Sequence, residues 1–316
     1  GLIILAMSKS LGMIYLARVV SGLTAGNLTV AQAAIADFTP PKDRARAFGI
    51  IGIAFGLGFF IGPAISGSLA PYGNSTPVWA SAGLSFLSIL ATLLLMPKRP
   101  PSIHKHVGFH IRELLLVFRF KVIFQHLQRP ETKHNLIRFF LFNLSFAAYL
   151  SGFAIYVEKR YSWKGSPFGP REVGFIYSYL GLLGIFIQGF VLGRVVKRWG
   201  ESRVATAGFL LQGLGYAAFS FVTGIPGLLA ASTIGSSGSG MVRPALTAAL
   251  SKSAKPEEQG AILGVSQSLA SIAAVLAPLI AGTLIENVSL TAWALIAGGF
   301  AFIGIFWQDK TKKELF

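Results

Sequence analysis

The chain has 316 residues, of which 53% are hydrophobic and only 13% are charged. A soluble domain carries about 25% charged residues, so this composition excludes an ordinary soluble protein and predicts an all-α integral membrane protein. The net charge of +16 does not indicate nucleic-acid binding, because no basic stripe stands apart from the apolar blocks.

The apolar residues form long blocks, and a block of about 18 residues or more with almost no charge predicts a spanning helix. Nine such blocks follow one another along the chain: 11–36, 48–70, 78–96, 136–157, 173–193, 204–223, 226–250, 260–285 and 290–308. Residues 1–8 are apolar but too short to span, and no basic segment precedes them as in a signal peptide. We expect them to be the end of a further spanning helix, in a chain that lacks its own start.

The block 11–36 contains Arg18, which shares a helix face with small and polar residues as far as Gln32. A polar face on a membrane helix is expected to meet a protein interior or a water-filled path. Arg18 lies about two turns inside the helix, so its side chain could also extend to the membrane interface. We favour a cavity arginine that shifts the pKa of a neighbouring carboxylate, because the face below it stays polar for three turns.

The block 48–70 is rich in glycine, and Pro63 lies inside it. Two glycine pairs, Gly52/Gly56 and Gly58/Gly62, have the four-residue spacing that lets helix backbones approach closely. The turn before this block contains Asp37, two prolines and three basic residues. The pattern predicts a packed helix pair joined by a short charged turn, with close packing alone as the simplest role for the glycines.

Residues 97–135 form the longest polar segment and contain all five histidines and eight of the basic residues. A zinc site is one interpretation, but the chain has no cysteine and no carboxylate–histidine pair with metal-ligand spacing. We therefore predict a basic cytoplasmic linker, in which 109–127 has the alternation of a surface helix. The predicted domains are a truncated N-terminal helical half, 1–96, this linker, and a C-terminal half of six helices, 136–316.

Of the 28 lysines and arginines, 20 fall in one set of alternating loops and 5 in the other. Since basic residues are retained on the cytoplasmic side, this asymmetry predicts that the first set, with the C-terminal tail, is cytoplasmic. The opposite loop 158–171 holds four of the five exceptions.

An internal repeat appears when the chain is compared with itself at an offset of 215 residues. Pro63 then falls on Pro278, and Gly67 on Gly282, with no gap over about 50 residues. Both copies run inward and then outward, so the repeat is parallel, as in carriers built from two similar six-helix halves.

The motifs resemble the major facilitator superfamily, and within it the drug–proton antiporters of the tetracycline-efflux type. The segment Arg18-x-x-x-Gly22-x-x-x-Gly26 resembles the fourth-helix motif of that family, whose arginine is associated with proton coupling. The run from Gly49 resembles the fifth-helix antiporter motif, with Ser66-Gly67 in place of a glycine pair. Residues 193–200 resemble the loop motif of the second half, with Lys197 where the family usually has Asp.

The resemblance implies roles for particular residues. Arg18 is expected to act in proton coupling, and the glycine face is expected to pack against the equivalent helix 260–285 and to control closure of the outer side. A cytoplasmic gate is expected at Asp37, Arg44, Arg46 and Arg198; antiporter-motif packing at Gly49, Gly58, Gly62, Pro63 and Gly67; and a substrate cavity at Gln32, Asn143, Tyr149, Ser236 and Arg243.

No carboxylate lies at mid-depth in any of the nine blocks, although a proton-coupled carrier needs one that titrates inside the membrane. The acid lies in helices outside this chain, or Asp37 or Glu158 carries the proton, or the coupling is not to protons. We favour the first alternative. For Asp37 we favour a structural gate pair with a basic residue.

These observations predict a secondary transporter that exports a small amphipathic compound in exchange for protons. Uptake of a sugar or other metabolite on the same fold is an alternative, and so is a degenerate membrane protein that does not transport. No nucleophile–base pair or phosphate-binding loop indicates an enzyme. We expect no cofactor besides the proton gradient, no metal and no nucleic acid, and a monomer in the bacterial inner membrane that contacts only lipid, substrate and protons.

Overall fold

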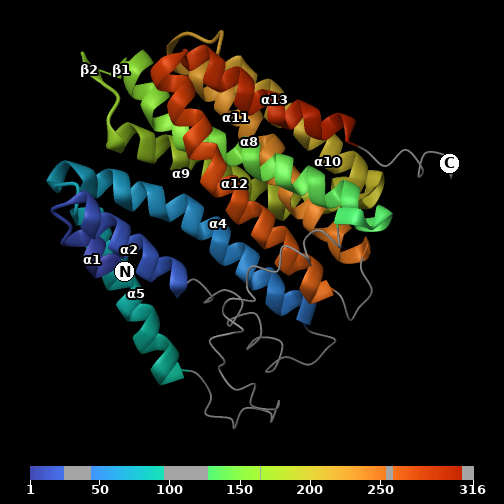
Figure 1. The fold of residues 1–316 in the computed structure, drawn as a ribbon, viewed down its shortest axis with the longest axis horizontal. Helices are drawn as coiled ribbons and strands as arrows, with labels where there is room; N and C mark the ends of the chain where they lie inside the picture. The colour runs from blue at the N-terminus through green and yellow to red at the C-terminus, as the bar shows by residue number, and fades with distance from the viewer. Residues whose placement is uncertain (25–43, 96–126, 164, 254–258, 308–316) are drawn as a thin grey trace. The chain divides into compact units, whose positions relative to one another are not determined.

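The computed structural model describes residues 1–24, 44–95, 127–163, 165–253 and 259–307 (Figure 1). This part of the chain is helical apart from one short hairpin, so the prediction of an all-α fold is confirmed. The elements are α1 (Leu2–Ala6), α2 (Leu11–Leu23), α4 (Arg44–Leu69), η2 (Ala70–Tyr72), α5 (Thr76–Leu95), α8 (Pro130–Arg160), β1 (Ser162–Trp163), β2 (Ser166–Pro167), α9 (Pro170–Phe186), η4 (Ile187–Val191), α10 (Leu192–Ala218), α11 (Gly224–Ser253), α12 (Gln259–Asn287) and α13 (Leu290–Phe306).

Each of the nine predicted blocks contains one of these helices, but some bounds differ. The predicted linker was placed as far as residue 135, whereas α8 begins at Pro130 with the proline in its first turn, where a missing N–H costs nothing. Residues 194–203, the basic segment between the predicted blocks 173–193 and 204–223, are helical and do not form the expected turn. The chain changes direction there only at Gly200, whose φ of 76° suits a residue without a side chain.

Four helical stretches of the described residues are long and apolar enough to cross a membrane: Thr76–Leu95, Thr132–Arg160, Pro170–Ala218 and Ile262–Asn287. The third includes the kink at Gly200. Among the shorter apolar helices are α2 and α13. Their lengths and composition agree with a protein that passes through the membrane several times.

The chain divides into two compact units, which are described separately. Unit 1 comprises Gly1–His110 together with Gly169–Gly181, and unit 2 comprises Ile111–Phe168 together with Leu182–Phe316. In unit 1, α1 packs against α2 and α5, and α4 packs against α5. The helix α9 belongs to unit 1 as far as Gly181 and to unit 2 from Leu182 onward.

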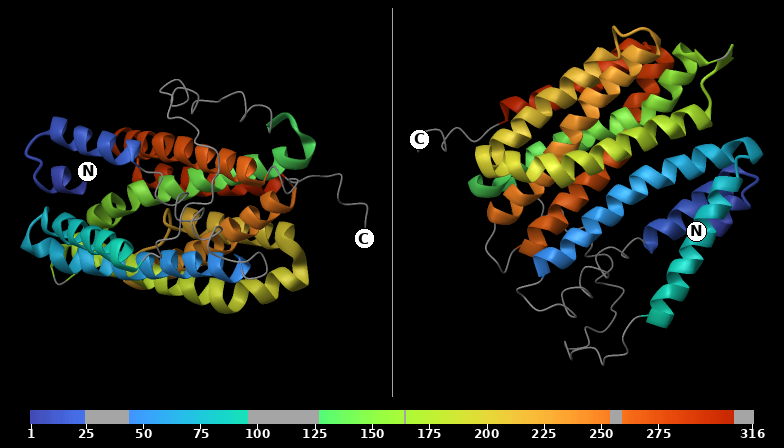
Figure 2. Two further views of the ribbon diagram at one scale, coloured as in Figure 1. Left: turned by 90° about the horizontal axis from the view of Figure 1, so that it is seen from below. Right: turned by 180° about the vertical axis from the view of Figure 1, so that it is seen from behind.

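Unit 2 is a bundle around α8 and α10. The helix α8 packs against α11, α12 and α13, and α10 packs against α11 and α13, as the two views in Figure 2 show. Six aromatic residues, which we call the aromatic cluster, pack together inside this bundle near the C-terminal ends of α8 and α10: Tyr149, Phe153, Tyr156, Tyr216, Phe219 and Trp293. All six are almost fully buried, so the bundle has a closed core.

Helices α4 and α12 correspond to each other in the internal repeat. Each contains one proline, Pro63 and Pro278, and these two are 215 residues apart. In the repeat, α12 of unit 2 is therefore the equivalent of α4 of unit 1.

Candidate functional site

A close helix contact in unit 1 joins α4 to the first part of α9, and backbone atoms make it. A Cβ atom on Gly174 would lie 2.6 Å from the carbonyl oxygen of Pro63, and one on Gly181 would lie 2.5 Å from that of Phe59. A Cβ on Gly67 would lie 3.1 Å from the Cα of Gly174. A Cβ cannot occupy the positions at Gly174 and Gly181 unless the backbones move, and at Gly67 it would be a tight contact, so the close approach depends on these glycines. We call this contact the α4–α9 junction.

The residues expected to form the antiporter-motif packing are not all in this junction. Gly67 is buried there, and Pro63 contributes its carbonyl oxygen. A Cβ on Gly58 or Gly62 would meet no atom within 4 Å, so these two glycines face open space within the structure. Gly49 belongs to α4, but its surroundings lie outside the described side chains.

Within unit 1, the helix that packs on this face of α4 is α9. The predicted partner, helix 260–285, belongs to unit 2, so its packing against the glycine face stays a prediction. The sequence contains a signal for the α9 contact, since Gly174 and Gly181 are seven residues apart and therefore lie on one face of a helix. The glycine pattern of block 48–70 indicates only the α4 half of the junction, and the glycines of α9 supply the other half.

The predicted proton-coupling residue, Arg18, lies on α2 with an exposed side chain. Of the predicted gate residues, Asp37 lies outside the described residues, and the side chains of Arg44 and Arg46 lie outside them as well, although both residues belong to α4. Arg198 is exposed on α10, two residues before the Gly200 kink. Arg44 and Arg46 belong to unit 1 and Arg198 belongs to unit 2, and the gate roles of these residues stay predictions.

Two of the predicted cavity residues lie inside unit 2. Tyr149 is 4% exposed and stacks on Tyr216, with ring centroids 4.4 Å apart and planes 9° from parallel. Asn143 is also buried, and its Nδ2 donates to the carbonyl oxygen of Phe139 in the preceding turn, at 2.7 Å. Their positions do not support contact with a substrate, because their side chains serve the packing of the bundle.

The other cavity candidates lie on α11 or outside the described residues. Ser236 is partly buried and Arg243 has an exposed side chain. Gln32 lies outside the described part of the chain. Ser236 and Arg243 are seven residues apart, which places them on one face of α11 and keeps both available as candidates.

The structure adds a buried cation that the sequence analysis did not use. Arg138 of α8 is 2% exposed, donates to Oγ1 of Thr206 at 2.9 Å and lies over the ring of Phe209 at 5.3 Å. Its Nε atom has no hydrogen-bond acceptor among the described residues. The signal was an arginine inside an apolar block, the same feature that drew attention to Arg18. Its contacts indicate that it joins α8 to α10.

A polar link joins three helices of unit 2 near the aromatic cluster. The hydroxyl of Ser145 donates to the carbonyl oxygen of Ala297 on α13 at 2.7 Å and accepts from Nε2 of Gln212 on α10 at 3.0 Å. Nε1 of Trp293 on α13 donates to the carbonyl oxygen of Ala148 on α8 at 2.9 Å. Hydrogen bonds between helices hold α8, α10 and α13 in register, so unit 2 is suited to move as one body.

Helices of spanning length, with glycine-mediated helix contacts inside each of the two units, define an integral membrane carrier of several passes. The sequence profile of the Major Facilitator Superfamily matches residues 1–201 and again 168–315. The chain therefore belongs to the Major Facilitator Superfamily, a family of membrane transporters.

Known relatives agree with this assignment. The chain is 29% identical over 307 residues to the class B tetracycline resistance protein of Escherichia coli, covering 92% of this chain and 70% of the relative. It is 31% identical over 292 residues to the class C protein of Escherichia coli, with the same coverage. The crystal structure of the human organic anion transporter MFSD10 (TETRAN) superposes with a TM-score of 0.69 at 23% identity, covering 97% of this chain and 73% of that structure.

Proposed function

We propose that this transporter exports a small amphipathic compound in exchange for protons by alternating access. The observation that carries the proposal is the α4–α9 junction, where three glycines bring two backbones together on the helix that carries the antiporter-like motif. The relatives named for tetracycline resistance favour a drug as the exported compound. The bacterial inner membrane is the proposed location, with the C-terminus in the cytoplasm.

In the proposed cycle the α4–α9 junction closes the outer side of the carrier when it forms and opens that side when it separates. A contact between backbones suits such a gate, because van der Waals packing between helices in lipid is gained only when the two backbones approach closely. Arg18 is the proposed coupling residue. A guanidinium beside a carboxylate favours the charged form of the acid, and the attraction between the two groups is lost when the acid is protonated. The proton-carrying acid is proposed to lie outside the described residues.

Drug accumulation in cells provides the test. Cells that express the transporter are expected to accumulate less tetracycline than cells with an empty vector, and a proton uncoupler is expected to remove the difference. Arg18→Gln is expected to abolish uncoupler-sensitive export, whereas Arg18→Lys retains the charge and is expected to retain part of it. Accumulation that does not change with the uncoupler would exclude proton coupling, and higher accumulation in expressing cells would indicate uptake.

A further inference from the structure

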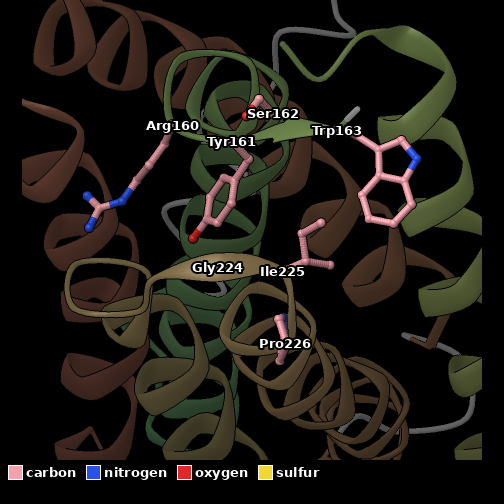
Figure 3. Close-up of a pocket in the computed structure, with 7 residues that line it drawn as sticks. All are labelled: Arg160, Tyr161, Ser162, Trp163, Gly224, Ile225 and Pro226. Carbon is pink, nitrogen blue, oxygen red and sulfur yellow. The ribbon is translucent and has the colours of Figure 1, made fainter. Parts of the chain in front are cut away.

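A cavity of about 600 Å³ opens at one end of unit 2, between the C-terminal end of α8 and the start of α11. It is lined by Arg160, Tyr161, Ser162, Trp163, Gly224, Ile225 and Pro226. Figure 3 shows Arg160 and Trp163 on opposite sides of Tyr161, with Ile225 and Pro226 below them in this view. One edge of the cavity is therefore cationic, and the other edge is aromatic and apolar.

Hydrogen bonds fix the wall of this cavity. Tyr161 ends α8, and its hydroxyl donates to the carbonyl oxygen of Val222 at 3.3 Å, in the segment between α10 and α11. The backbone N–H of Phe168 donates to the carbonyl oxygen of Tyr161 at 3.1 Å, which ties the hairpin β1–β2 to the same point. Gly224 has a φ of 72°, a conformation that glycine adopts readily, and it turns the chain into α11. The cavity is thus part of the folded framework of unit 2.

The charged group at the cavity is accessible. Arg160 is exposed, and its guanidinium lies over the ring of Tyr156 at 5.9 Å. Its Nη2 donates to the carbonyl oxygen of Val222 over a long 3.4 Å. A guanidinium carries five N–H donors in a planar fork that matches the oxygens of a phosphate. Most of these donors remain available for an anion.

The charge of this loop is unusual for its position in the chain. Residues 158–171 contain four basic residues, on the side of the membrane where the count of lysines and arginines predicts few of them. Because basic residues there oppose the topology signal, their presence favours a local function. The function most directly available to them is binding of an anion.

The cavity also lies where the chain leaves the hydrocarbon region. Arg160 is the last residue of the apolar helix α8, and Ile225 is the second residue of α11. Trp163 is 53% exposed, as expected for an aromatic residue at the level of the lipid headgroups. The anion that is most abundant at this level in a membrane is a lipid phosphate.

We propose that this cavity binds the headgroup of an anionic phospholipid, with the phosphate on Arg160 and the start of an acyl chain along Trp163 and Ile225. The guanidinium supplies charge and paired donors, and the aromatic edge supplies the apolar contact that a soluble anion does not use. The proposal depends on membrane insertion and is independent of the transported substrate and of proton coupling.

The test measures retained lipid by native mass spectrometry on the transporter purified in detergent, with phosphatidylglycerol added at rising concentration. We expect Arg160→Gln to weaken binding of phosphatidylglycerol about tenfold. The matched control is Lys159→Gln, which removes the same charge from the adjacent exposed residue that does not line the cavity. It is expected to change binding less than twofold. Equal loss in both variants would show a response to net charge alone and would overturn the proposal.

A second pair of variants tests the aromatic edge. Trp163→Ala is expected to weaken phosphatidylglycerol binding about fivefold, whereas Trp199→Ala is expected to leave it unchanged. Trp199 is the matched control because it is 49% exposed and lies on α10, away from the cavity lining. A thermal unfolding curve of each variant confirms that it is folded, and Arg160→Lys is expected to recover part of the binding.

Two competitors identify the ligand. Phosphatidylcholine, whose headgroup is zwitterionic, is expected to bind at least tenfold more weakly than phosphatidylglycerol. Inorganic phosphate at millimolar concentration is expected not to displace the bound lipid, because it lacks the apolar chain. Equal binding of both lipids, or displacement by phosphate, would contradict an anionic phospholipid site.

Discussion

Two helix contacts in this transporter use glycine in different ways. At the α4–α9 junction, Gly174 and Gly181 of α9 face carbonyl oxygens of α4, and the one glycine pair is Gly67 with Gly174. Gly58 and Gly62 of α4 face open space. Between α10 and α11 the glycines lie on both helices and face each other. The pairs there are Gly208 with Gly238 and Gly215 with Gly235.

The surroundings of the two contacts differ as well. The α10–α11 contact lies beside the aromatic cluster, and Tyr216 also bonds across it to Ser239, with 2.9 Å between the two hydroxyl oxygens. The α4–α9 junction is made by backbone atoms of helices whose large apolar side chains remain exposed, such as Phe59 and Phe175. A contact with two glycine pairs and a hydrogen bond between side chains is expected to be permanent, and a contact made by one glycine pair and backbone carbonyl oxygens is expected to form and separate during transport.

The largest effect is expected from Gly215→Ala, at the permanent contact. Its new Cβ would overlap the backbone nitrogen and Cα of Gly235, which cannot move aside as a side chain can. We expect a loss of about 3 kcal/mol in the free energy of unfolding, measured by unfolding in an SDS titration. Gly299→Ala on α13 is the control, because a Cβ there meets no atom within 4 Å. Equal stability of the two variants would contradict the fixed contact.

The next largest effect is expected from Gly181→Ala, at the α4–α9 junction. Its Cβ would lie 2.5 Å from the carbonyl oxygen of Phe59, so the junction cannot close fully. If the junction forms in only one state of the cycle, the transport rate should fall about tenfold, which corresponds to a barrier higher by ~1.4 kcal/mol. The midpoint of unfolding should stay near that of the unmodified protein.

The controls for this variant lie on both helices. Gly184→Ala on α9 and Gly62→Ala on α4 introduce a Cβ into open space, so transport should stay within about twofold. Loss of folded protein in Gly181→Ala would show that the junction is a permanent contact like that between α10 and α11. Loss of transport in Gly62→Ala would instead support the packing role that the motif predicts for Gly62.

A smaller effect is expected from Ser145→Ala, which removes the polar link between α8, α10 and α13. The substitution deletes two hydrogen bonds at a fully buried position, and hydrogen bonds between membrane helices are each worth about 0.6 kcal/mol. We expect unfolding to become easier by about 1 kcal/mol. Ser151→Ala is the matched control, since that hydroxyl bonds only to the carbonyl oxygen of Ala147 on the same helix. If Ser151→Ala lowers the free energy of unfolding as much as Ser145→Ala does, the polar link does not stabilise the contact between the helices.

The smallest effect is expected at the ion pair between Lys252, near the end of α11, and Glu201, beside the Gly200 kink. The side chain of Lys252 is 69% exposed, and exposed pairs contribute about 0.5 kcal/mol or less. Lys252→Ala should therefore shift the unfolding midpoint by no more than Lys197→Ala, an exposed lysine of α10. A clearly larger loss that disappears at high salt would show that this pair helps to fix the α10–α11 contact.

Much of the fold was predictable, because hydrophobic length and helix period are local properties. Each apolar block overlaps a helix, and the repeat at offset 215 pairs α4 with α12, each of which contains a proline at the matching position. The turn at 194–203 was predicted as a break because it is rich in charge, but helix formation continues through charged residues that reach water. Only Gly200 has the backbone conformation that turns the chain.

The site was less predictable, because residue type does not reveal the partner. Tyr149 and Asn143 have polar side chains that suit a cavity, yet the structure buries them in unit 2. Gly58 and Gly62 have the spacing of a packing motif, whereas the packed glycines of the α4–α9 junction lie mostly on α9. Spacing states which residues share a face, and it leaves open which helix will cover that face.

The sequence by itself determined that this is a helical membrane transporter of the Major Facilitator Superfamily, since hydrophobic blocks, the repeat and the motifs are all written along one chain. The tertiary structure alone decided which backbones touch. Close approach depends on the absence of a side chain on one helix and on the position of a carbonyl oxygen on another, far away in the sequence. That pairing separates the permanent α10–α11 contact from the α4–α9 junction proposed to open and close.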